Sequence, residues 1–174
     1  MRRVRYSVAM SLDGYVAGPK GEIDWIMMDP EIDFAALASS FDTMLMGRKT
    51  YEAARQQGGG PAMPGTQAYV VSRTLRQPDC PGVTVSDNAK DTVEKLRAAS
   101  GKDIWLFGGG SLFRSLLGMG VVDTVEVAII PVLLGGGIQL LPDPAERAKL
   151  KLTKHRVYAK TGTVALEYDV RLAA

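Results

Sequence analysis

Three short segments place glycine or serine, together with cationic and hydroxyl side chains, directly after a run of apolar residues. They are residues 46–50 (Met-Gly-Arg-Lys-Thr), 70–74 (Val-Val-Ser-Arg-Thr) and 107–111 (Phe-Gly-Gly-Gly-Ser). Glycine lets a ligand approach the backbone, a helix N-terminus attracts anions, and arginine can hold a phosphate with two hydrogen bonds. One such segment is equally consistent with a tight turn whose charges only face solvent. Three together favour a nucleotide ligand with several phosphates.

The familiar nucleotide-binding motifs do not account for these segments. The fingerprint G-x-G-x-x-G fails at residues 108–113 because Phe113 stands in place of the third glycine, and no phosphate loop of the type G-x-x-x-x-G-K-[ST] occurs. Cys80 is the only cysteine and His155 the only histidine, which leaves little material for a metal site or a Ser-His-Asp triad. We therefore expect no bound metal.

Composition narrows the possible partners. The chain has 174 residues, 46% hydrophobic and 23% charged, and a net charge of +2, which describes one globular domain over residues 1–174. Because no basic block stands out, nucleic acid is not the expected partner. No signal peptide or membrane span is visible, and a single cysteine fits the reducing cytoplasm. We expect a cytoplasmic protein that binds a small molecule.

The three segments need a scaffold that brings them together. Period-two alternation and short apolar runs predict strands at 4–10, 43–46, 68–72, 83–86, 104–107 and 124–131, with a C-terminal hairpin at 156–159 and 163–172. Helices are predicted from Asp29-Pro30 through Phe41, at 48–55, at 91–99 and after the glycines at 108–110. Residues 13–21 and 58–65 read as loops and 135–137 as a turn. Alternation of strands and helices favours a mostly parallel sheet, whose carboxyl ends would gather the three segments at one edge.

The order of the motifs adds a family resemblance. Residues 11–17 (Ser-Leu-Asp-Gly-Tyr-Val-Ala), 46–52, 71–73 and 107–113 follow one another as in dihydrofolate-reductase-like proteins. Residues 122–126 and 130–137 resemble the branch formed by the C-terminal reductase domain of bifunctional riboflavin-biosynthesis (deaminase/reductase) proteins. The likeness spans roughly residues 3–172. It implies a three-layer α/β fold with a mixed, mostly parallel sheet of about eight strands, an antiparallel C-terminal hairpin and flanking helices.

The resemblance also implies NADPH as the cofactor and assigns residues to it. Gly47, Arg48, Lys49 and Thr50 would hold the pyrophosphate and the adenosine side, and Ser72 and Arg73 would meet the ribose 2′-phosphate. Gly108, Gly109, Gly110, Ser111 and Leu112 would cover the pyrophosphate at a helix N-terminus. Ala9 and the loop that contains Asp13, Gly14, Val16 and Ala17 would frame the nicotinamide. The physical interpretation of these residues agrees with the resemblance.

The resemblance further implies an acid on the substrate side. Counting back from Gly47 places Glu31 where folate reductases carry the carboxylate that favours protonation of the pterin, with Asp29 and Asp33 nearby. Acids in the first turn of a helix are also favoured by the helix dipole alone, so the choice among the three stays open. Trp25 and Phe34 could stack on a flat heterocycle or belong to the core.

Two departures from folate reductases bear on the substrate. Thr66 stands where they carry an arginine that binds the substrate's carboxylate, and Ala128 stands where they carry a threonine that contacts the acid. The leading hypothesis is an NADPH-dependent reductase of a small heterocyclic or carbonyl/imine substrate, such as a ribosylamino-pyrimidine intermediate of riboflavin biosynthesis. Dihydrofolate reduction and a non-catalytic nucleotide-binding or regulatory module are the alternatives. We expect a homodimer, for which the apolar residues 129–141 could supply an edge strand.

Overall fold

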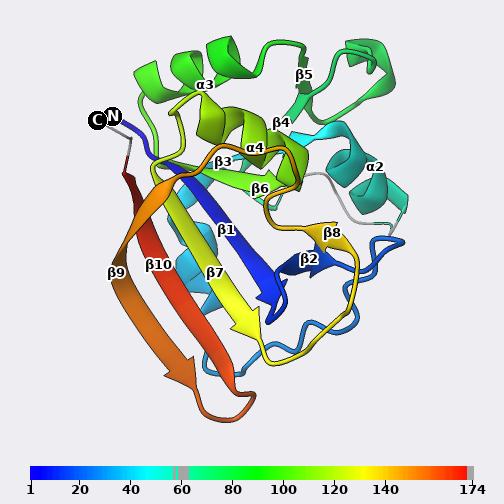
Figure 1. Cartoon of the computed structure of the whole chain (residues 1–174). Helices are drawn as coiled ribbons and strands as arrows, with labels where there is room; N and C mark the ends of the chain where they lie inside the picture. Colours follow the sequence, from blue (N-terminus) through cyan, green and yellow to red (C-terminus); the bar gives the residue numbers. More distant parts are fainter. Residues whose placement is uncertain (57, 59–62, 172–174) are drawn as a thin grey trace.

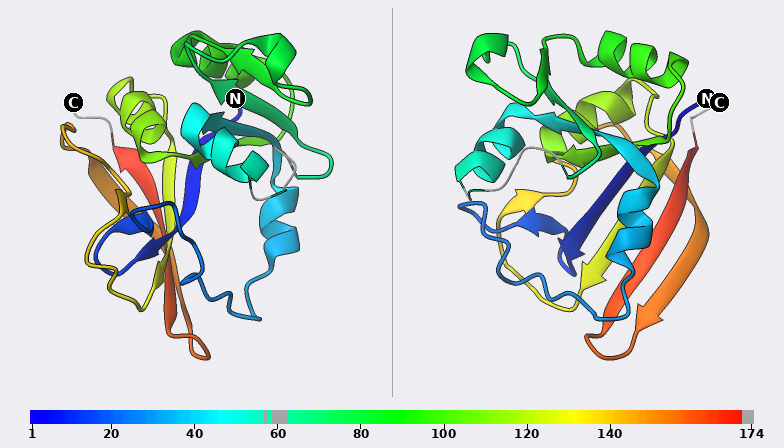
Figure 2. Two further views of the ribbon diagram at one scale, coloured as in Figure 1. Left: turned by 90° about the vertical axis from the view of Figure 1, so that its right-hand side faces the viewer. Right: turned by 180° about the vertical axis from the view of Figure 1, so that it is seen from behind.

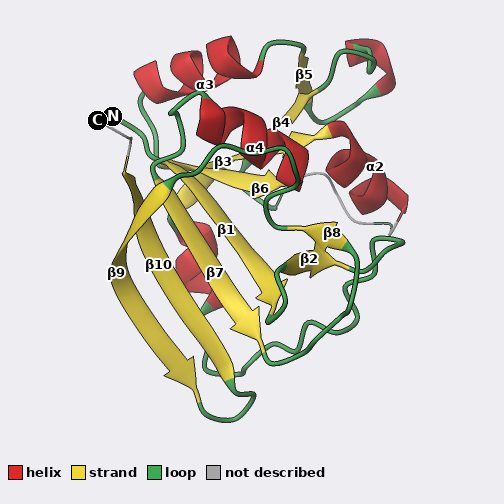
Figure 3. Cartoon of the chain, viewed as in Figure 1, coloured by secondary structure: helices red, strands yellow, loops and turns green. Residues whose placement is uncertain are grey.

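The computed structural model describes residues 1–56, 58 and 63–171, and its centre is an eight-stranded sheet (Figures 1 and 3). The strand order is β5-β4-β3-β6-β1-β7-β10-β9. The bounds are β1 Val4–Ser11, β3 Phe41–Gly47, β4 Gln67–Val71, β5 Thr84–Ser86, β6 Asp103–Gly108, β7 Thr124–Ile130, β9 Lys149–Tyr158 and β10 Thr163–Arg171. Neighbouring strands are parallel except where β10 pairs with β7 and with β9. The predicted mixed sheet with an antiparallel C-terminal hairpin is confirmed.

Helices cover both faces of this sheet. They are α1 (Phe34–Ser39), α2 (Arg48–Gln56), α3 (Ala89–Ala98) and α4 (Gly110–Gly118), with a short 3-10 helix, η1, at Gln77–Asp79. Helix α4 lies in front of the sheet in Figure 1 and shares one core with α3, whereas α1 lies behind the sheet, which the rear view in Figure 2 shows directly. The predicted three-layer arrangement is therefore confirmed.

Successive side chains along each strand point to opposite faces of the sheet, and those on one face form the hydrophobic core. Val4 and Tyr6 of β1 belong to the main core with Leu45 of β3 and Leu106 of β6. The Tyr6 ring stacks on Phe113 of α4 at a centroid distance of 3.9 Å, an arrangement that adds specific geometry to the burial of two large rings. A second core lies over β3 and β4, where Met44, Met46 and Val70 pack against Tyr51 of α2.

The intervening residues of the same strands point to the opposite face. On β1 these are Arg5, Ser7 and Ala9, and on β6 they include Trp105 and Phe107, all of which line a large groove. Of the helices in the described part of the chain, α1 stands over this part of the sheet, and it buries none of its own residues. The fold thus leaves one side of its central strands open between α1 and the sheet.

One helix prediction is wrong at both ends. Helix α1 begins after Asp33, whose carboxylate accepts a hydrogen bond from the Ala36 N–H at 2.8 Å, so Asp29-Pro30 does not start it. Asp29 instead accepts hydrogen bonds from Thr161 in the β9–β10 turn, which draws residues 29–32 away from a helical path. At the other end, Phe41 begins β3 and packs on Trp105.

Three further segments differ from their predictions. The segment 13–21 contains β2 (Tyr15–Ala17), which pairs with β8 (Ile138–Gln139) in a second small sheet. Strand β9 begins at Lys149, seven residues before the predicted start at 156. Ile129 and Ile130 lie in β7, between β1 and β10, so they are not on a sheet edge. Residues 59–62 of the predicted loop at 58–65, and Leu172, lie outside the described residues.

Candidate functional site

A groove of about 1410 Å³ crosses the open face of the sheet. It starts at the carboxyl ends of β3 and β6, beside α2 and α4, and it extends under α1 to β9 and β10. Its floor comes from β1, β6 and β7, and its walls come from residues 21–37 and from residues 137–142. The groove therefore runs without interruption from the strand ends to the space under α1.

The three segments predicted to bind phosphates meet at one edge of the sheet. In the strand register, Gly47 of β3 pairs with Val71 of β4, and Met46 pairs with Gly108 of β6. Residues 46–50, 70–74 and 107–111 thus leave three adjacent strands at the same level. The expected gathering at the carboxyl ends follows directly from parallel pairing.

Small residues let two of these turns approach each other. A Cβ added at Gly109 would lie 3.3 Å from Thr50 Oγ1, and one at Gly47 would lie 3.8 Å from Leu112 Cβ. Gly108 has φ +130°, which disfavours any residue with a side chain. Gly109 is also the N-cap of α4 and offers no side chain to bond the first N–H groups. The N–H groups of Leu112 and Phe113 bond Gly109 O, whereas those of Gly110 and Ser111, at the positive end of the helix dipole, have no backbone acceptor among the described residues and could meet an anion.

The residues predicted to contact the cofactor fall into two groups. Those that line the groove are Ala9, Val16, Gly47, Lys49, Thr50, Gly109, Gly110, Ser111 and Leu112. Those outside its lining are Asp13, Gly14, Ala17, Arg48, Ser72, Arg73 and Gly108. The roles of both groups in cofactor binding stay predictions.

Some residues outside the lining have structural partners of their own. Arg48 Nη1 donates to both Glu52 carboxylate oxygens at 3.0 Å, one turn further along α2. The buried Ser72 hydroxyl accepts hydrogen bonds from the N–H groups of Thr74 and Leu75 and shapes the turn that carries Arg73. Arg73 itself is exposed at the rim of this edge.

Asp13 fastens a neighbouring loop to the end of β1. Its carboxylate accepts hydrogen bonds from Ser11 Oγ at 2.6 Å, Gly135 N at 2.7 Å and Leu134 N at 3.1 Å. The Ser11 hydroxyl, followed by these backbone N–H groups, holds the pKa of Asp13 below its ordinary value. Asp13 therefore positions the chain around β2 and β8, which in turn borders the groove.

The sequence did not predict that residues 137–142 cover the first turn of α4. Residues 137–142 run from β8 across Gly110, and a Cβ there would lie 2.7 Å from Gln139 O and 2.9 Å from Pro142 Cδ. Gly137, Ile138, Gln139 and Pro142 all line the groove. The only local signal was the glycine run at 135–137, which indicates a turn but not its neighbours.

On the substrate side, the three candidate acids separate. Glu31 is exposed and outside the groove lining, where it pairs with Arg156 at 3.3 Å and Lys160 at 3.8 Å. Glu31 lies in a turn before α1 and not in the first helical turn. Asp33 lines the groove, although its carboxylate also caps α1.

Asp29 is the third candidate, and it is 2% exposed. Its carboxylate accepts hydrogen bonds from Glu31 N, Thr161 N and Thr161 Oγ1 at 2.9–3.1 Å. Burial raises the pKa of Asp29, but the hydrogen bonds from Glu31 and Thr161 outweigh it and leave the pKa below the ordinary value. Asp29 therefore ties the wall of the groove to the β9–β10 turn as a carboxylate.

The floor under α1 carries a charge cluster that no local pattern indicated. Arg5 binds Glu126 through Nε to Oε1 at 2.6 Å and Nη2 to Oε2 at 3.0 Å, and Nη1 lies 3.4 Å from Asp103 Oδ2. The guanidinium stands 4.6 Å from the centre of the Phe41 ring. Burial lowers the pKa of Arg5, but the hydrogen bond and charge of Glu126 and the charge of Asp103 raise it overall.

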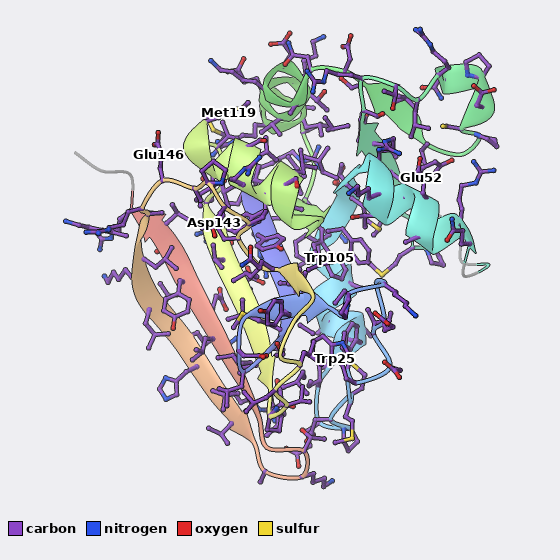
Figure 4. All side chains as sticks on the ribbon, turned by 45° about the vertical axis from the view of Figure 1, so that its right-hand side comes forward. Trp25, Glu52, Trp105, Met119, Asp143 and Glu146 are labelled. Atoms are coloured by element: carbon purple, nitrogen blue, oxygen red, sulfur yellow. The ribbon has the colours of Figure 1, made fainter. Side chains whose placement is uncertain are left out.

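The two positions that depart from folate reductases lie apart. Ala128 of β7 lines the groove, whereas Thr66 precedes β4, bonds Met63 O and does not line it. Trp25 donates its indole N–H to Glu22 O and also lies outside the lining, on the loop beyond β2, while Trp105 lies on β6 in the floor (Figure 4).

Among the described residues, no three His, Cys, Asp or Glu side chains cluster as a metal site would require. None of the described helices is long and apolar enough to cross a membrane.

This fold is that of a dihydrofolate-reductase-like α/β protein. The sequence model of the RibD C-terminal domain matches residues 2–164, and the chain belongs to that family. The protein YyaP of Bacillus subtilis is 35% identical over 178 residues, covering 96% of this chain and 94% of its own length. Another Bacillus subtilis protein, YwjB, is 29% identical over 157 residues, with 87% and 89% covered.

Solved structures agree in fold. A pyrimidine reductase-like protein from Corynebacterium diphtheriae superposes with a TM-score of 0.75 at 19% identity, covering 99% of this chain and 93% of its own. A diaminohydroxyphosphoribosylaminopyrimidine deaminase/5-amino-6-(5-phosphoribosylamino)uracil reductase from Thermotoga maritima superposes with a TM-score of 0.70 at 17% identity, covering 97% of this chain and 56% of its own. At these identities the likeness shows the fold alone, and the family supports an oxidoreductase.

Proposed function

We propose that this protein is an NADPH-dependent reductase that transfers hydride to a C=N or C=O bond of a small heterocyclic or carbonyl substrate. The observation that carries the proposal is the meeting of three glycine- or serine-bearing turns at the strand ends, beside a groove that continues under α1. Membership of a reductase-domain family supports the same chemistry.

The residues at the strand ends fit a dinucleotide cofactor. The N–H groups of Gly110 and Ser111 at the start of α4 suit a pyrophosphate, and Lys49 on α2 and the exposed Arg73 offer positive charge nearby. We assign Arg73 and Ser72 to the ribose 2′-phosphate, which would favour NADPH over NADH. When bound, the cofactor supplies a hydride, and the chain's residues bind, orient and shield the two reactants.

On the substrate side, the proposal needs one proton for the atom that gains the electron pair. Glu31 is the acid that the family resemblance suggests, and Asp33 is the alternative that lines the groove. Comparing Glu31→Gln with Asp33→Asn separates them, because the variant that removes the acid lowers kcat while NADPH affinity stays the same. Equal and unchanged kcat in both variants would remove both carboxylates from the mechanism.

The first experiment is cofactor binding measured by thermal unfolding. A ligand at 100 times its Kd adds about 2.7 kcal/mol to the unfolding free energy, so NADPH should raise Tm clearly and NADH less. Arg73→Ala should weaken NADPH about ten- to hundredfold, as expected for loss of charge-assisted hydrogen bonds, and leave NADH nearly unchanged. Arg76→Ala, an exposed cation in the same connection, is the matched control. No Tm shift with either nucleotide would refute the cofactor assignment.

If NADPH binds, substrates are screened by loss of its absorbance. The family points first to a ribosylamino-pyrimidine intermediate of riboflavin biosynthesis. Dihydrofolate is the comparison substrate, since Thr66 and Ala128 lack the groups that folate reductases use. Binding without turnover of any substrate would favour the alternative of a non-catalytic nucleotide-binding module. The proposal includes a cytoplasmic location, consistent with Cys80 as the only cysteine.

A further inference from the structure

The part of the groove under α1 carries large apolar side chains that the fold leaves in water. Met27 is 58% exposed, Met28 49% and Phe34 45%, and all three line the groove. Ile23, on the same segment, is also exposed and lines it. Several large apolar groups gathered at one concave surface indicate a binding site for an apolar ligand.

These side chains contribute little to the protein's own core. None belongs to either core cluster, and α1, which begins with Phe34, buries no residue against the sheet. Phe107 of β6, which is itself exposed, lines the same groove from the sheet. A flat ring lying between Phe34 and the sheet would remove apolar surface from water on both of its sides.

The cations in the same part of the groove are already occupied by carboxylates. Arg5 is held by Glu126 and Asp103, and Arg3 Nη2 lies 2.7 Å from Asp169 Oδ1. Arg156 pairs with Glu31 at 3.3 Å.

The remaining cation there, Lys154, stands directly across the strand pair from Glu167. Glu167 is in turn the register neighbour of Glu126 on β7, and both carboxylates line the groove. A phosphate dianion would have to displace these carboxylates or lie beside them, and like charges in proximity cost binding energy.

We propose that the substrate is an unphosphorylated, planar aromatic compound with a reducible C=O or C=N group. This deepens the proposed function and rests on it, because the hydride comes from NADPH. The hydride forms a new C–H bond at the electrophilic carbon, and the π electrons of the double bond move to oxygen or nitrogen. That atom then takes one proton, and NADPH becomes NADP⁺. The apolar wall selects the ring, and the paired charges on the floor reject a phosphate.

The test compares kcat/KM of the full chain for matched substrates. A ribosylaminopyrimidine 5′-phosphate is compared with the same compound after dephosphorylation, and a phosphate-free aromatic aldehyde and a quinone are added. The unphosphorylated member of the pair should have a kcat/KM higher by about tenfold or more. An equal or higher kcat/KM for the phosphorylated member overturns the inference and leaves the reductase proposal standing. NADPH binding without turnover of any phosphate-free compound also overturns it, whereas no NADPH binding refutes the proposed function itself.

Single substitutions test whether the substrate binds in the apolar part of the groove. Met27→Gln should raise KM for the apolar substrate about tenfold, with the Kd for NADPH unchanged. Met119→Gln is the matched control, because Met119 is 46% exposed, is not part of the groove, and lies at the far end of α4, well away from the loop that carries Trp25 (Figure 4). Phe34→Ser is the second variant, with the same expectation. Unchanged KM in both groove variants would contradict the apolar site.

Discussion

Replacing Gly110 by alanine tests how residues 137–142 cover the start of α4. The new Cβ would lie 2.7 Å from Gln139 O, 2.9 Å from Pro142 Cδ and 3.2 Å from Leu140 O. Two of these atoms are backbone oxygens, which cannot rotate away, so the cover must shift. Overpacking of this kind costs about 1–3 kcal/mol, against a gain in helix propensity of at most about 1 kcal/mol.

Gly118→Ala is the matched control because it lies in the same helix and its Cβ meets nothing within 4 Å. Urea unfolding should find Gly110→Ala less stable than Gly118→Ala by about 1–3 kcal/mol at an unchanged m value. The shifted cover should also weaken NADPH binding in Gly110→Ala only. Equal stability of the two variants would mean that residues 137–142 do not press on α4, and the account of this edge of the groove would be wrong.

Three further predictions concern other parts of the molecule. Because the pKa of Asp29 is lowered in the folded state, its contribution to stability is complete above the ordinary aspartate pKa of about 3.9 and is lost as the pH falls through the lower folded value. The stability difference between wild type and Asp29→Asn should therefore shrink below about pH 4 in urea titrations; a difference that grows toward acid would contradict this. Phe113→Leu removes the ring stacked on Tyr6 and should lower the unfolding free energy by about 1–3 kcal/mol, whereas a loss below about 0.5 kcal/mol would show that the stack contributes little. Because Ile129 and Ile130 lie inside the sheet, the homodimer expected through residues 129–141 would instead use the edge strand β9, where Leu150 and Leu152 are exposed. Sedimentation should find a dimer that Leu152→Glu dissociates and Lys151→Glu does not; a monomeric wild type would refute it.

Local sequence patterns predicted most of the sheet because its strands are set by alternation and by short apolar runs. Val4, Tyr6 and Val8 alternate with Arg5 and Ser7, and the structure makes this segment the strand β1 in the middle of the sheet. The parallel order then follows from the intervening helices, which explains why the phosphate-binding segments could be placed at one edge.

What the sequence did not indicate depends on contacts between distant residues. Asp29-Pro30 is a good local start for a helix, but the bonds from Thr161, 132 residues away, hold Asp29 elsewhere. Arg5 and Glu126 are separated by 121 residues, and nothing near either one indicates their pairing. Strand β9 did carry a local signal in the alternation of lysine and leucine at 149–152, which the prediction overlooked.

The two faces of β1 give this protein a way to change during evolution. Val4 and Tyr6 are buried in the core, so their replacement would cost stability, whereas Ser7 and Ala9 of the same strand point to the other face and line the groove. A mutation at Ser7 or Ala9 can therefore alter which molecules fit while the packing beneath it is retained. Descendants of one ancestor could diverge in substrate by such exchanges and keep the same scaffold.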